Sequence, residues 1–301
     1  MKLKKTVIIV GSEGQDGKIL YEKIRNNFTK IICLNKINFD ITNKIKIVNL
    51  IKKNKPSYIY FFAAYHNSSE DNQKENFQSM INSYNVNYLA PKYFLEAIND
   101  YHRKCKFFFA SSSLIFKSSK LLLNENSQIK VNEFYSFFKY ETMKLCSYYR
   151  EKKKIFVNVG ILFNHESKYR KNNFLTKKII SHAIKNNKGS KRKLIIGNIS
   201  TKVDWSYAED VVDAILAIQK IKNSGDFVIS SGKSHSVKEL LNITYSYFNL
   251  NYKDFVIIKK NIIKRKPENR IGNPAKLIKM TGWKQRTNFK QMIINLIESQ
   301  I

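Results

Sequence analysis

The sequence predicts an α/β protein with a doubly wound parallel sheet and a smaller C-terminal lobe. Three observations support this. Short β-branched and apolar runs alternate with longer amphipathic segments in the first half of the chain, as expected of parallel strands joined by helices. A glycine-rich turn follows the first run. Later the alternation becomes irregular, which favours a nucleotide-binding domain (1–165) and a substrate-binding lobe (166–301), some of whose strands and helices return to the first domain.

The first predicted strand and the turn after it form a dinucleotide-binding fingerprint. Thr6–Val10 is a β-branched run of the kind buried in a parallel sheet. It leads through Gly11, Gly14 and Gly17 into a predicted helix, Lys18–Asn26. Glycines at this spacing permit a tight turn and a close approach of the backbone to a pyrophosphate, whose charge the helix N-terminus stabilises. We therefore predict a Rossmann domain that binds NADP or NAD.

Residues after the second and third strands bear on the choice between these cofactors. The second strand, Ile31–Leu34, is followed by Asn35 and Lys36, where NAD-preferring folds carry a carboxylate. A lysine would attract the 2′-phosphate of NADP, although Lys36 equally suits a solvated strand end. Asp40 could accept a hydrogen bond from the adenine amino group or cap the helix that follows. Ala64, which ends the third strand, is a further predicted cofactor contact.

The remaining predicted elements continue the alternation and then lose it. Pro91 lies inside the longest predicted helix and should kink or interrupt it. The further elements expected in the first domain are helix Lys44–Lys53, strand Tyr58–Ala64, helix Asn82–Asp100, strand Cys105–Ala110, helix Tyr135–Lys153 and strand Ile155–Leu162. Those expected in the second part are helix Phe174–Asn186, strands Lys193–Ile196 and Asp226–Ser230, and helices Val237–Phe248 and Asn288–Ser299.

A serine, a tyrosine and a lysine form the predicted catalytic centre. Ser112 follows the fourth strand, and Tyr135 and Lys139 stand four residues apart on one face of the next helix. A phenol is a poor base at its usual pKa of about 10, but the charge of a lysine, together with that of a nicotinamide ring, would lower that pKa. The three groups could move a proton while a nicotinamide takes a hydride. Tyr140 and Lys144 repeat the spacing, but they lie deeper in the helix, which favours a packing role.

Composition excludes several classes of function. The chain carries 54 Lys and Arg against 23 Asp and Glu, a net charge of +31. Most of these cations are lysines scattered along the chain, so we attribute the charge to compositional drift and predict neither nucleic acid nor a membrane as partner. No apolar run could span a bilayer, and the N-terminus lacks a signal-peptide pattern. Three separated cysteines fit a reducing compartment, hence the cytoplasm. The five histidines show no metal-ligand spacing.

Motifs distributed over nearly the whole chain carry a family resemblance. They are Val10–Gly17, Gly160–Ser167, Asn173–Ile179, Gly197-Asn198, Asp204–Ala208, Ser234–Val237, Gly272–Pro274 and Gly282–Lys284. In these stretches the chain resembles the extended short-chain dehydrogenase/reductases, and more narrowly the GDP-mannose 4,6-dehydratase family. The resemblance implies a tightly held nicotinamide cofactor, a nucleotide-sugar substrate that is GDP-linked, and a homodimer paired through the helices matching Asn82–Asp100 and Tyr135–Lys153.

The resemblance also implies a reaction and its residues. In that family, hydride leaves sugar C4 for the cofactor, water is lost across C5 and C6, and the hydride returns to C6. Matched residue by residue, Ser112 takes the place of a catalytic threonine, with Tyr135 and Lys139 as the tyrosine and lysine. The residues that fall where the family meets the nucleotide sugar are Asn164, Glu166, Lys178 and Arg265 or its neighbour Lys266, each of which also suits a solvated loop or helix face.

Three departures from the family leave the reaction open. Leu114 aligns with the glutamate that removes the C5 proton, and leucine cannot accept a proton. The connection from Asn35 to Asp40 is shorter than the family loop that helps to bind the 2′-phosphate and to build a tetramer, and Val203 replaces an arginine. One hypothesis is a 4,6-dehydratase that uses another base; Glu133 is a sequence neighbour of the tyrosine. The alternatives are a 4-keto reductase, C4 oxidoreductase or epimerase, and an inactive nucleotide-sugar binder, which the intact catalytic residues disfavour.

Overall fold

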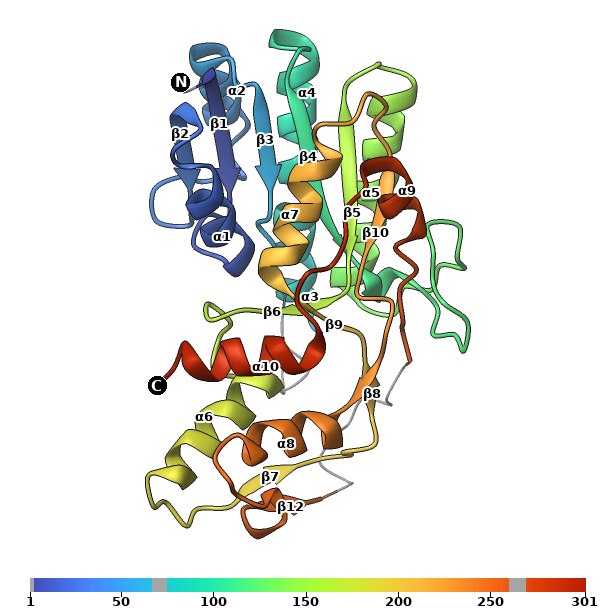
Figure 1. Cartoon of the computed structure of the whole chain (residues 1–301). Helices are drawn as coiled ribbons and strands as arrows, with labels where there is room; N and C mark the ends of the chain where they lie inside the picture. Colours follow the sequence, from blue (N-terminus) through green and yellow to red (C-terminus); the bar gives the residue numbers. More distant parts are fainter. Residues whose placement is uncertain (1–2, 67–74, 260–268) are drawn as a thin grey trace.

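A parallel six-stranded sheet forms the centre of the protein (Figure 1). The computed structural model describes residues 3–66, 75–259 and 269–301. The sheet order is β10-β5-β4-β3-β1-β2, with every neighbouring pair parallel. Its strands are β1 (Leu3–Val10), β2 (Phe28–Leu34), β3 (Tyr58–Phe61), β4 (Lys106–Ser112), β5 (Val157–Leu162) and β10 (Asp226–Ile229). The predicted doubly wound parallel sheet is confirmed.

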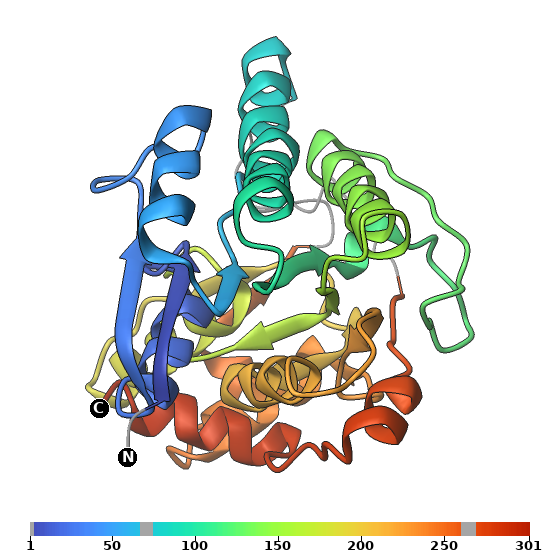
Figure 2. The same cartoon turned by 90° about the horizontal axis from the view of Figure 1, so that it is seen from above.

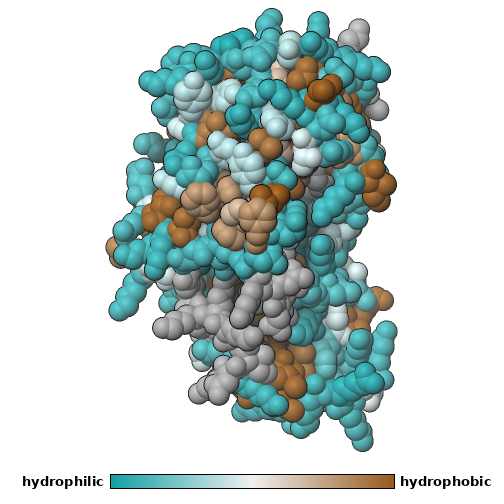
Figure 3. Space-filling view, turned by 180° about the vertical axis from the view of Figure 1, so that it is seen from behind, coloured by the Kyte–Doolittle hydropathy of each residue, from teal (hydrophilic) through white to brown (hydrophobic). Residues whose placement is uncertain are grey.

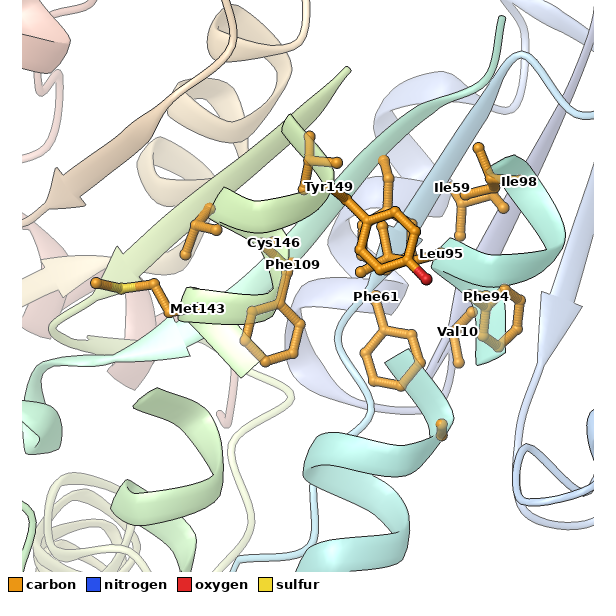
Figure 4. Close-up of a cluster of buried hydrophobic side chains, with 14 of the residues drawn as sticks. Val10, Ile59, Phe61, Phe94, Leu95, Ile98, Phe109, Met143, Cys146 and Tyr149 are labelled. Atoms are coloured by element: carbon orange, nitrogen blue, oxygen red, sulfur yellow. The ribbon is translucent and has the colours of Figure 1, made fainter. Parts of the chain in front are cut away.

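Helices cover both faces of this sheet (Figure 2). On one face lie α2 (Lys44–Asn54), α4 (Ala90–Tyr101) and α5 (Phe134–Glu151); on the other lie α1 (Gln15–Ile24), α7 (Ala208–Ile218) and α9 (Ala275–Thr281). Successive residues of a strand point to opposite faces, so the strands supply two apolar cores. Figure 4 shows the first of these cores, where Phe61 and Phe109 from the sheet lie among side chains of α4 and α5 such as Phe94 and Cys146.

The long helix predicted around Pro91 is divided into three parts. α3 (Phe77–Tyr84) leads into a π-helical turn, η1 (Asn85–Leu89), and then into α4. Pro91 falls in the first turn of α4, where a missing N–H costs little. The interruption at Pro91 is therefore confirmed, but the helical segment begins earlier than predicted. Asn76 starts it, because the Asn76 side chain accepts from the Ser79 N–H in a capping box.

The C-terminal part of the chain builds a third core and also returns to the sheet. α6 (Leu175–Asn187), α8 (Val237–Ser246) and α10 (Phe289–Glu298) surround this core with the strand pair β7 (Leu194–Ile196) and β12 (Val256–Ile258). α7 and α9 were missed in the sequence. α7 has buried residues around most of its circumference, so its pattern lacks the single apolar stripe that marks a surface helix. Among the described residues, no helix is long and apolar enough to cross a membrane.

Asp204 joins three segments that are distant in the sequence. Its side chain is fully buried, and its Oδ1 accepts from the backbone N–H and the hydroxyl of Ser231. Its Oδ2 accepts from the Gly272 N–H at 3.0 Å. The carboxylate thus connects the segment between β8 (Lys202–Val203) and β9 (Trp205–Tyr207) with the loop after β10 and with the segment before α9.

We expect Asp204→Asn to destabilise the protein by about 1–3 kcal/mol, because an amide has one acceptor oxygen and leaves a buried N–H unpaired. The change should lower the midpoint of equilibrium urea unfolding. Asp254→Asn, at an exposed position in the 3₁₀ turn η3 (Tyr252–Asp254), is the matched control and should shift the free energy of unfolding by less than about 0.5 kcal/mol. Equal midpoints for the two variants would contradict the assigned role of Asp204.

Candidate active site

The glycine turn lies where the strand order reverses, between β1 and β3, the usual ligand crevice of such sheets. Gly11 has φ +86°, and a Cβ there would come within 2.6 Å of the Ala63 backbone nitrogen. A Cβ at Gly17 would come within 2.5 Å of the Gly11 carbonyl oxygen. α1 begins beside this turn, and its N-cap, Gly14, provides no side-chain cap. Backbone N–H groups at an uncapped helix start, in a cradle that only glycine allows, fit a pyrophosphate.

The loop after β2 holds the residues predicted to contact the adenosine end of a cofactor. The Asn35 side chain accepts from two backbone N–H groups of its own turn, and Lys36 is exposed. Asp40 accepts from the backbone and the hydroxyl of Thr42, and these hydrogen bonds lower its pKa. The alternative role of Asp40 as a helix cap is wrong, because Asn43 caps α2 by accepting from the Lys46 N–H. The exposed Ala64 lies just beyond β3.

The structure brings Ser112, Tyr135 and Lys139 together. Ser112 ends β4, and its hydroxyl hydrogen-bonds with the phenol of Tyr135 in the first turn of α5. The Lys139 Nζ lies 5.7 Å from the centroid of the Tyr135 ring and donates to the Ala110 carbonyl at 2.8 Å. In contrast, Lys144 of the repeated Tyr-Lys spacing is half exposed and ion-paired. The arrangement places a hydroxyl, a phenol and an amine at one strand end.

Burial sets the protonation of this cluster. Lys139 is 1% exposed, and burial lowers its pKa to about 7. Burial also raises the pKa of Tyr135 to about 12, despite the opposing hydrogen bond to Ser112 and the charge of Arg170. The expected lowering of the phenol pKa by lysine is therefore wrong for the chain alone, because desolvation of the phenolate is the larger effect.

A buried ion pair links the glycine fingerprint to the second part of the chain. The Asp16 Oδ1 lies 2.9 Å from the His165 Nε2, and the other ring nitrogen of that histidine lies 2.7 Å from the Phe163 carbonyl oxygen. Burial disfavours both charges, but their attraction lowers the pKa of Asp16 and raises that of His165. Gln15 reinforces the link by donating to the His165 carbonyl. These residues were not predicted as a site, because 149 positions separate the pair.

The predicted substrate contacts lie in different surroundings. Asn164 is exposed on β6 (Asn164–Glu166), which pairs with β9. Glu166 is 3% exposed and lies 3.4 Å from the Nε of Arg170, and burial raises its pKa. Lys178 is exposed on α6. Arg265 and its neighbour Lys266 lie outside the described residues.

Leu114 lies two residues after Ser112, the predicted catalytic serine. It lies in a short 3₁₀ turn, η2 (Ser113–Ile115), and its N–H donates to the Ser112 Oγ at 3.2 Å. Two residues after Ser112 the chain therefore carries an apolar, partly buried side chain. Within the described ranges, no group of three or more His, Cys, Asp or Glu could hold a metal ion.

Comparison with known proteins gives a consistent result. A family model described as GDP-mannose 4,6 dehydratase matches residues 8–296. GDP-mannose 4,6 dehydratase 1 of Arabidopsis thaliana is 31% identical over 212 residues, which cover 69% of this chain and 59% of that protein, so the chain spans less than two thirds of this relative's length. A structure of RMD from Pseudomonas aeruginosa complexed with NADPH has a TM-score of 0.83 at 18% identity, covering 98% of this chain and 99% of that one. A dTDP-glucose 4,6-dehydratase structure from Bacillus anthracis, in complex with NAD, has a TM-score of 0.84 at 16% identity, covering 98% and 96%.

Proposed function

Because this chain belongs to the GDP-mannose 4,6 dehydratase family, we propose that it is an NADP- or NAD-dependent enzyme that dehydrates a GDP-linked hexose across C5 and C6. The observation that carries this proposal is the contact between Ser112, Tyr135 and Lys139 at the end of β4. The glycine cradle of the first turn lies at the same edge of the sheet. The cluster therefore stands where a nicotinamide and a sugar can meet.

Each of the three side chains has a separate role in the reaction at sugar C4. Ser112 and Tyr135 bind the C4 oxygen, and Tyr135 takes its proton as the carbon is oxidised. A nicotinamide cofactor held at the glycine cradle would supply the redox chemistry, which is hydride transfer from C4 and then to C6. The Lys139 ammonium lies over the Tyr135 ring, and when this lysine is protonated its charge favours the phenolate form of Tyr135. The ketone at C4 makes the C5 proton acidic, which prepares the loss of water from C5 and C6.

We prefer NADP to NAD. Asn35 occupies the position where a carboxylate would bind the ribose hydroxyls, and its side chain is already committed to the turn. Lys36, exposed next to it, meets the charge of a 2′-phosphate. Gly11, Gly14 and Gly17 hold the pyrophosphate, and Asp40 and Ala64 contact the rest of the cofactor.

The C-terminal lobe, 166–301, binds the nucleotide part of the substrate. Asn164, Glu166 and Lys178 contact it from β6 and α6, and Arg265 meets the diphosphate. Three cysteines without disulfide partners support a cytoplasmic location.

The decisive test is to incubate the purified protein with GDP-mannose and NADP in deuterated water and to follow the sugar by NMR. The expected product is a 4-keto-6-deoxy sugar that carries deuterium at C5, because the C5 proton exchanges with solvent during elimination. Failure to convert GDP-mannose, combined with oxidation of NADPH by a 4-keto sugar, would instead identify a C4 reductase.

The helical face formed by α3, α4 and α5 supports a homodimer. Phe77, Phe137 and Tyr148 are 74%, 43% and 48% exposed on these helices. Figure 3 shows apolar patches on this side of the molecule, set among hydrophilic residues. Exposed aromatic side chains on one face are typical of protein interfaces.

We expect the protein to have the mass of a dimer in light scattering coupled to size-exclusion chromatography. The double substitution Phe137→Asp and Tyr148→Asp should give a monomer, because an unpaired charge in an apolar interface is strongly unfavourable. Ile195→Asp, at a 44% exposed position on β7, is the control and should stay dimeric. A double variant that remains a dimer would exclude this helical face as the interface.

A further inference from the structure

A histidine that the proposed chemistry has not used lies against the catalytic tyrosine. The rings of His66 and Tyr135 are 4.4 Å apart between centroids, with their planes at 75°. His66 is exposed and follows β3, on the side of the sheet edge where Ser112 ends β4. The imidazole therefore contacts the ring whose phenol is proposed to hold the C4 oxygen, and C5 is the carbon next to C4.

The segment that carries His66 is fixed by an asparagine from the π-helical turn. Asn87 accepts from the N–H of Tyr65 at 3.1 Å and donates to the carbonyl of Tyr65 at 2.9 Å, so it holds both backbone groups of the residue before His66. Asn87 is fully buried, and its own carbonyl accepts from the Thr142 hydroxyl of α5 at 2.6 Å. π-helical turns are frequent at functional sites. This one ties the His66 segment to the helix that bears Tyr135.

The carboxylates around Tyr135 are engaged in other contacts. Asp16 pairs with His165, and Glu166 pairs with Arg170. Glu75 accepts from the first N–H of α5 at 2.6 Å.

The carboxyl residue nearest in sequence to Tyr135 is also engaged. Glu133 forms the capping box at the start of α5. Leu114 offers no proton acceptor. Lys139, which also lies over the Tyr135 ring, donates to the Ala110 carbonyl and already serves the phenol in the proposed chemistry. The imidazole is therefore the further basic group that the described part of the chain holds against Tyr135.

We propose that His66 is a catalytic residue that removes the C5 proton in place of the missing carboxylate, an inference that rests on the proposed dehydratase function. After C4 is oxidised, the imidazole takes the C5 proton, the C–H electron pair forms the C5–C6 double bond, and hydroxide leaves C6. The imidazolium returns its proton to that hydroxide, so water is released. Solvent then protonates the imidazole again, and after hydride addition at C6 the imidazolium donates this proton to C5. One ring thus serves first as base and then as acid, a role for which histidine is well suited.

The test separates proton removal at C5 from hydride transfer at C4. Wild type and His66→Asn are mixed with GDP-mannose and NADP, and the formation of reduced nicotinamide is followed in a single turnover. In parallel, exchange of the C5 proton of the 4-keto-6-deoxy product is followed by NMR in deuterated water, a step that needs a base but no redox change. His102→Asn, at the end of α4 and away from Tyr135, is the matched control.

For His66→Asn we expect reduced nicotinamide to form as in wild type, and C5 exchange and turnover to fall by about 10²–10⁴-fold. Adding Leu114→Glu to that variant should restore part of the exchange, which a purely structural role of His66 would not allow. His102→Asn should behave as wild type. Exchange at the wild-type rate in His66→Asn and in a second variant, His66→Gln, would overturn the assignment of the base alone. A wild-type protein that neither reduces NADP nor exchanges C5 would overturn the proposed function, and the inference with it.

Discussion

Replacing Tyr135 by phenylalanine is expected to lower kcat by about 10²–10⁴-fold, the usual contribution of a general acid–base group. Phenylalanine keeps the ring that packs against His66 and Lys139 but removes the oxygen that bonds Ser112. The proton of the C4 hydroxyl group then has no acceptor, so reduced nicotinamide should not form from GDP-mannose in a single turnover. KM should change little, because the ring and its neighbours remain in place.

Tyr140→Phe is the matched control, since the same substitution falls five residues later on the same helix. The Lys144 Nζ lies 5.1 Å from the Tyr140 ring centroid, but that lysine is ion-paired with Glu141 and half exposed. Turnover of this variant should equal that of the wild type. Wild-type activity in Tyr135→Phe, with loss in Tyr140→Phe, would transfer the catalytic role to the second tyrosine.

The parts of this molecule that the sequence predicted are those encoded locally. The strand Thr6–Val10 and its glycine turn are read from adjacent residues, and the spacing of Tyr135 and Lys139 places both on one helical face. Such patterns depend on backbone periodicity, which tertiary contacts seldom reverse. The fold and the relative positions of the predicted catalytic residues therefore agree with the structure.

The parts that the sequence did not predict depend on contacts between distant segments. Asp16 meets His165 across 149 positions, and Asn87 holds Tyr65 across 22. Neither pairing has a spacing that could mark it in the chain. The predicted lowering of the Tyr135 pKa was wrong for a related reason. Burial raises this pKa, and the burial results from tertiary packing, which the spacing of Tyr135 and Lys139 in the sequence does not reveal.

Substitution of Gly17 by alanine should abolish measurable cofactor binding and destabilise the protein. The new Cβ would come within 2.5 Å of the Gly11 carbonyl oxygen and 2.7 Å of the Ser12 Cα, and both are backbone atoms that cannot move aside. The turn would have to open, which separates α1 from the end of β1. We expect a loss of at least about 100-fold in NADP affinity, and a decrease of about 1–3 kcal/mol in the free energy of unfolding, as for other overpacked sites.

Gly14→Ala is the matched control for Gly17→Ala. A Cβ at Gly14 meets the same carbonyl oxygen at 3.3 Å, and the residue has φ −72°, which alanine adopts freely. The two variants add the same methyl group to the same fingerprint, but only at Gly17 does that group come closer than 3.0 Å to backbone atoms. Calorimetric titration with NADP should therefore show near wild-type affinity for Gly14→Ala and none for Gly17→Ala. Equal affinities would mean that the close packing at Gly17 does not shape the pyrophosphate site.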